Sequence, residues 1–93
     1  MVKYVCNQER EVNTMLNQIV KALEEQYKTE LFYTKTGVEN SHSAEQADKC
    51  QWYSIQRCLG MMELAQQLGL PYEVAEPMFQ EVKEKIYKLK FTP

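Results

Sequence analysis

The segment from Ala44 to Leu68 constrains the fold most, because it is apolar over more than one helical stripe. One face repeats at helical spacing and carries Trp52, Ile55, Leu59 and Met62. A second face carries Tyr53, Met61, Leu64 and Leu68. A helix on the surface of a globular protein needs one apolar stripe, so a helix with two must be covered on both sides. We therefore expect a helical core that the chain, or a second copy of it, completes.

Two further segments have helical periodicity. In the first, apolar residues recur near a seven-residue repeat, at Val12, Leu16, Ile19, Leu23, Tyr27 and Leu31. In the last, they follow a 4-3-4-3 spacing, at Ala75, Phe79, Val82, Ile86 and Leu89. We predict a single domain over residues 1–93, with helices at residues 8–35, 44–68 and 73–90.

Capping residues set the predicted helix ends. Asn7 is suited to begin the first helix, and Gly37 to end it as a left-handed residue. Ser43 and Gln46 have the spacing of a capping box at the start of the second helix, and Gly69 follows its end. Residues 1–6 alternate like a short extended strand.

Pro77 leaves the start of the last helix open. Either the helix begins near Glu76 with Pro77 in its first turn, or it begins earlier and bends at Pro77. We favour the later start, because Pro71 makes the preceding segment turn-like.

These segments predict an all-α fold, with a long antiparallel hairpin of the first two helices and a shorter third helix packed across it. A first helix of about 28 residues would span about 40 Å. A compact chain of this length has a radius of gyration near about 12 Å. The mismatch favours a homodimer or larger oligomer, with a two-fold interface at Tyr53, Met61, Leu64 and Leu68.

Charge and cysteine content exclude several classes of protein. Eleven basic and thirteen acidic residues give a net charge of −2, so nothing favours a nucleic-acid partner. No apolar run approaches the roughly 20 residues that span a bilayer, and residues 1–6 lack the apolar stretch of a secretory signal. Three cysteines, an odd number, argue against a disulfide framework and favour reduced thiols. We expect a cytoplasmic protein without a membrane partner.

Catalytic and metal-binding signals are weak. Glu39 and His42 have the Glu-x-x-His spacing of di-metal helical bundles, but they fall in a predicted loop. Cys6, Cys50 and Cys58 lack paired Cys-x-x-Cys spacing, and nothing local places one beside His42 as a nucleophile. We expect no catalytic residue, no metal site, no cofactor and no enzymatic activity.

The stretch around Gly69 resembles the turn of a helix-turn-helix motif. Ala65 would be the small residue at the crossing, and Leu70 the buried turn residue. The next helix, however, opens with Glu73 and Glu76, which would repel phosphates. A DNA-binding regulator is therefore an alternative hypothesis.

The surplus of apolar and aromatic residues supports the leading hypothesis, a non-enzymatic adaptor or inhibitor that binds a protein partner. Tyrosine and tryptophan are enriched at protein interfaces. The candidate interaction residues are Tyr33, Trp52, Tyr53, Met61, Leu64, Leu68 and Tyr72. A small-ligand binder, with a pocket between helices or subunits near Trp52, is a further alternative.

Overall fold

The structure, a computed structural model, describes the backbone of residues 2–92 and the side chains of residues 13–92. It contains three helices, α1 (Val2–Glu39), α2 (Ala44–Gln67) and α3 (Tyr72–Tyr87), and no strand within the described range. The all-α, three-helix prediction is confirmed.

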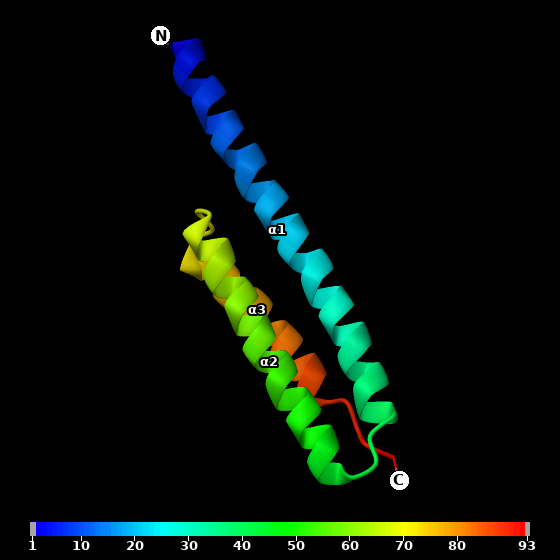
Figure 1. Ribbon diagram of the computed structural model, residues 1–93. Helices are drawn as coiled ribbons and strands as arrows, with labels where there is room; N and C mark the ends of the chain where they lie inside the picture. Colours follow the sequence, from blue (N-terminus) through cyan, green and yellow to red (C-terminus); the bar gives the residue numbers. More distant parts are fainter. Residues whose placement is uncertain (1, 93) are drawn as a thin grey trace.

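The three helices lie side by side in an elongated molecule (Figure 1). The chain reverses over residues 40–43, and again over residues 68–71. Its principal extents are 65 × 17 × 16 Å, and its radius of gyration is 17.1 Å. The N-terminal part of α1 accounts for the elongation, because it extends past the turn that joins α2 to α3 (Figure 1).

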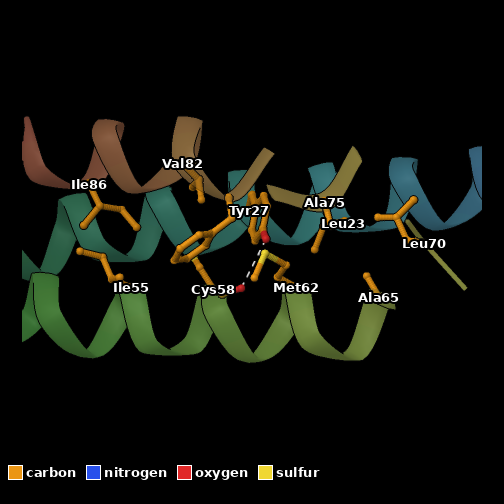
Figure 2. Packing of buried hydrophobic residues seen from close by; sticks show 11 residues of the cluster. Leu23, Tyr27, Ile55, Cys58, Met62, Ala65, Leu70, Ala75, Val82 and Ile86 are labelled. Carbon is orange, nitrogen blue, oxygen red and sulfur yellow. Dashed lines mark hydrogen bonds between the residues drawn. The ribbon is translucent and has the colours of Figure 1, made fainter. Parts of the chain in front are cut away.

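The core lies where the three helices meet (Figure 2). Figure 2 shows Ile86 and Val82 of α3 opposite Ile55 and Cys58 of α2, with the Tyr27 hydroxyl of α1 directed at the Cys58 carbonyl. The expected spacing of α3 is confirmed, because the residues at positions 75, 79, 82 and 86 are all buried. Periodic apolar spacing therefore identifies the buried face of α3 correctly.

Polar contacts join α1 to α2 near the loop. The hydroxyl groups of Thr34 and Ser54 are buried and hydrogen-bonded to each other, and the Thr34 hydroxyl also donates to the Glu30 carbonyl. Every buried side-chain nitrogen or oxygen among the described residues has a hydrogen-bond partner. The two helices can therefore pack closely here without an unsatisfied polar group.

The predicted bounds of the first helix are wrong at both ends. α1 begins at Val2, so residues 2–6 are helical instead of strand-like and Asn7 is no cap. Adding residues to an existing helix needs no new nucleus, and this outweighs a short two-residue alternation. At the other end, Gly37 lies inside the helix, because Val38 is buried and α1 continues to Glu39.

The start of α2 follows the capping prediction. The Ser43 side chain accepts a hydrogen bond from the Gln46 backbone N–H at 3.1 Å. The Gln46 side chain accepts from the backbone N–H of His42, one residue earlier than in the usual capping box. Both contacts satisfy free N–H groups at the helix start.

The turn between α2 and α3 is a Schellman motif. Gly69 has a φ of 115°, its N–H donates to the Gln66 carbonyl, and the Leu70 N–H donates to the Ala65 carbonyl. Leu70 itself is buried in the core. This motif fixes the path of the chain and requires glycine at position 69.

The late start that we favoured for the third helix is wrong. α3 begins at Tyr72 with Pro71 as its N-cap, and Pro77 lies inside it. The Pro71 carbonyl accepts from Val74 and Ala75, which forms the first turn before Pro77 is reached. α3 also ends earlier than predicted, at Tyr87.

The early end of α3 has a tertiary cause. The Gln51 side chain of α2 donates to the carbonyls of Ile86 and Leu89, at 2.9 and 2.7 Å. These bonds give the Leu89 carbonyl a donor and add a side-chain donor to the Ile86 carbonyl, which also accepts from the Leu89 N–H at 3.1 Å.

Candidate functional site

The two predicted apolar stripes of α2 have different environments. On the first stripe, Ile55 and Met62 are buried in the core, and Leu59 packs against it. On the second stripe, Leu64 is 52% exposed and Leu68 is 62% exposed. Leu64 follows Met62 by two residues, which is about 200° around a helix. The second stripe therefore faces away from the packed side, and we call this side of the α1–α2 pair the open face.

A groove runs along the open face between α1 and α2, with a volume of about 330 Å³. We call it the α1–α2 groove. None of the described residues that line it carries a charge. They are Met15, Gln18, Ile19, Ala22, Leu23 and Gln26 from α1, and Met61, Leu64, Ala65 and Leu68 from α2.

The open face continues toward the loop as a second hollow. This hollow shares Gln26, Met61 and Leu64 with the α1–α2 groove, and it extends to Tyr33 and Glu30. Exposed apolar and aromatic side chains thus follow one another along the α1–α2 pair.

An ion pair between the helices lies at this second hollow. Glu30 is buried, with 8% of its surface exposed, and its Oε1 accepts a hydrogen bond from Nε of Arg57 at 2.6 Å. A terminal nitrogen of the Arg57 guanidinium forms an ion pair with the same oxygen, also at 2.6 Å. The Glu30 carboxylate raises the pKa of Arg57. The pair joins α1 to α2 by a charge-assisted contact with directional geometry.

The predicted interaction residues do not form one site. Met61, Leu64 and Leu68 line the α1–α2 groove, and Tyr33 lines the adjoining hollow. Trp52 and Tyr53 contact each other edge to face, and together with Tyr87 of α3 they line a separate hollow. Tyr72 is exposed at the start of α3 and lines none of these hollows.

The contribution of α1 to the groove is not evident from the sequence. Met15 is 59% exposed and Ile19 is half-buried, and both face the second stripe of α2. Glu30 is a buried partner of Arg57 that the sequence-based prediction did not include. A signal was present, because Glu30 follows Leu23 by seven residues and so continues a buried register.

The core holds two groups with raised pKa values. Burial raises the pKa of the Tyr27 phenol to about 12 and that of the Cys58 thiol to about 12. The Tyr27 hydroxyl donates to the Cys58 carbonyl at 3.3 Å (Figure 2). Both groups therefore stay protonated at neutral pH, and the Cys58 sulfur is a packing group without thiolate character.

Among the described residues, no cluster of three or more histidine, cysteine, aspartate or glutamate side chains could hold a metal ion. Within the same part of the chain, no helix has the length and apolar character needed to cross a membrane.

The helices around Gly69 are arranged differently from those of a helix-turn-helix. The bonds from Gln51 to Ile86 and Leu89 place the end of α3 beside the first half of α2, so α3 runs back along α2 (Figure 1). A helix-turn-helix crosses its two helices at about 90–120°. The arrangement gives no support to the DNA-binding alternative.

Comparisons of the chain with protein-family models, with curated proteins and with solved structures find no match.

Proposed function

We propose that this protein is a non-enzymatic interaction module that binds a protein partner through the α1–α2 groove. The observation that carries the proposal is that, among the described residues, an uncharged groove stays uncovered, whereas Ile55, Leu59 and Met62 of the other stripe pack in or against the core.

The groove has the chemistry of an interface centre. Interface cores are depleted of charged residues and enriched in apolar, aromatic and methionine side chains. Met15, Leu64 and Leu68 are each more than half exposed. Covering each of them would contribute about 1 kcal/mol, since burying such a side chain fully is worth about 1.5–3 kcal/mol.

The Arg57–Glu30 pair supports an oriented contact beside the groove. The Arg57 side chain is 54% exposed, so its guanidinium group can reach a second acceptor while Glu30 holds it in place. A charged group at the rim of an apolar patch contributes more to partner choice than to affinity.

Leu64→Glu tests the proposal, because it places a charge in the groove at an exposed position that the fold tolerates. Phe32→Glu is the matched control, since Phe32 is an exposed apolar residue on α1, 66% exposed, that lines no part of the groove. Affinity-tagged wild type and both variants are to be compared for the proteins that co-purify, including untagged copies of the same chain.

We expect the wild type and Phe32→Glu to retain the same partner, and Leu64→Glu to lose it. Helical circular dichroism shows whether each variant is folded. Associations that are the same in all three proteins would contradict the proposal.

A small-ligand site is the second candidate, supported by the hollow of about 550 Å³ at Trp52, Tyr53 and Tyr87. Trp52 is the single tryptophan of the chain, so its fluorescence reports directly on this hollow. A panel of nucleotides and small metabolites that leaves the Trp52 emission unchanged would rule out binding of those compounds here.

A further inference from the structure

We infer that a second copy of this chain fills the α1–α2 groove, and that it does so with residues 2–14 of its own α1. We call residues 2–14 the arm. The inference rests on the proposed function, because it names the partner that covers the same groove.

The arm and the groove match in length. The arm is a helix of about 20 Å at 1.5 Å per residue. The lining residues of α1 run from Met15 to Gln26, which is about 17 Å along the same helix. A helix laid along a groove between two other helices is a common mode of recognition.

Symmetry supports the same occupant. The arm precedes the groove directly on α1, and the junction between them is at Met15. A two-fold axis near Met15 reverses the direction of the second α1 and places each arm over the groove of the other copy. Both grooves are then filled by one closed, isologous contact.

The charges of the two surfaces are compatible. The lining residues of the groove are uncharged, so two copies can approach without like-charge repulsion. The sequence of the arm has equal numbers of positive and negative residues, together with three valines: Lys3, Arg10, Glu9, Glu11, Val2, Val5 and Val12.

Packing against a second copy would also stabilise the arm as a helix. Figure 1 shows the arm beyond the end of the α2–α3 pair. The arm continues α1 and so needs no nucleus of its own, but most helical stability in proteins comes from the tertiary packing of an apolar face. A partner groove supplies that packing.

The contact area reaches what a specific dimer needs. Half of the surface of a helix about 10 Å wide and about 20 Å long is about 300 Å². Each copy contributes one arm and one groove, so about 1,200 Å² is buried in total. This lies at the lower end of specific interfaces.

Light scattering after size exclusion tests the assembly. The chain has a mass of 11.0 kDa, and we expect the full-length wild type to be a dimer of twice that mass at micromolar concentration. Leu64→Glu and Leu68→Glu should each weaken the dimer about 100-fold, because either carboxylate would be buried unpaired under the arm. Phe32→Glu should leave the dimer unchanged.

Photo-cross-linking tests the placement of the arm. A benzoylphenylalanine at Gln26, which lines the groove, is compared with one at Gln56, which is exposed and outside it. Mixing isotopically labelled and unlabelled copies identifies cross-links between chains. We expect the probe at Gln26 to capture residues 2–14 of the other copy, and the probe at Gln56 to capture none of them.

The outcomes separate this inference from the proposed function. A dimer with cross-links from Gln26 only to residues outside 2–14 overturns the arm placement, and a monomer overturns the second copy. If a monomer loses another protein partner in Leu64→Glu, the proposed function stands without this inference. Associations that Leu64→Glu leaves unchanged overturn both.

Discussion

The two apolar stripes of α2 are similar in sequence but differ in how far they are buried in the structure. Ile55 and Met62 are buried, whereas Leu64 and Leu68 stay exposed. The difference is that α3 packs along one stripe, whereas the other lines a groove that the described side chains of α1 cover only in part. Periodicity shows that a face must be covered, but the identity of the cover depends on which other elements the chain supplies.

The covered stripe is itself incomplete. Trp52 belongs to it by spacing, and yet it is 56% exposed. α3 has 16 residues and α2 has 24, so α3 cannot cover the whole length of α2. Trp52 lies near the end of that coverage, beside Tyr87, the last residue of α3.

Truncating one residue on each stripe should give the largest difference in the free energy of unfolding. We expect Ile55→Ala to reduce the free energy of unfolding by about 2–4 kcal/mol, because it leaves a cavity in the core. Leu64→Ala should change the stability of the monomer by less than about 0.5 kcal/mol. Urea unfolding at low protein concentration measures both, and equal losses would contradict the difference between the two stripes.

Alkaline pH should destabilise the folded protein through two groups in its core, the Tyr27 phenol and the Cys58 thiol. The pKa of Tyr27 rises from 10.0 to about 12 on folding, and that of Cys58 rises from 9.0 to about 12. A raised pKa favours the folded protein below the unfolded value, and this contribution is lost as the pH increases toward 12. Each group should contribute a loss of up to about 1.4 kcal/mol per pH unit within its window.

The control for the pH effect is Tyr27→Phe, which removes one of the two titrating groups. Urea midpoints measured from pH 8 to pH 12 should fall less steeply above pH 10 in this variant than in the wild type. Identical slopes would show that Tyr27 does not contribute.

Breaking the ion pair at the open face should have an intermediate effect. Arg57→Ala leaves the Glu30 carboxylate, whose side chain is 11% exposed, without its partner. We expect a loss of about 1–3 kcal/mol. Glu81→Gln, which removes the exposed pair of Lys85 and Glu81, is the control and should change stability by less than about 0.5 kcal/mol. A loss no greater for Arg57→Ala would count against a structural role for the Arg57–Glu30 pair.

Two glycines provide the smallest contrast. A Cβ on Gly37 would lie 2.7 Å from the Cys50 sulfur, whereas a Cβ on Gly60 would meet nothing within 4 Å. We expect Gly60→Ala to stabilise the protein by about 0.5–1 kcal/mol through helix propensity. Gly37→Ala should destabilise it by about 1 kcal/mol, because the overlap exceeds that gain. Adding Cys50→Ala to Gly37→Ala should recover the loss, and no recovery would show that the overlap is not the cause.

Helical spacing was sufficient to predict the fold class and the buried positions of α3. Helix ends were harder to predict, because they depend on contacts between distant residues. Gly37 does not stop α1, since Val38 is buried and extends the packed face. α3 ends next to Ile86, whose carbonyl accepts a hydrogen bond from Gln51 of α2. No local pattern contains these contacts.

The candidate site was predictable in part for the same reason. The sequence placed Leu64, Leu68 and Met61 on one stripe, and the structure brings them together. Met15 and Ile19 complete the groove from another helix, so their role depends on how α1 and α2 align. Trp52 and Tyr72 were grouped with them by residue type, and the structure places both elsewhere.

The two short connections, residues 40–43 and 68–71, have a consequence for the kinetics of folding. Each pair of consecutive helices can form as soon as a small loop closes, and helical proteins rich in such local contacts fold in microseconds to milliseconds. Association of two chains is bimolecular, so its rate falls on dilution. If a second copy fills the groove as proposed, a newly folded chain keeps its groove exposed for a time set by its concentration in the cell and not by its own folding rate.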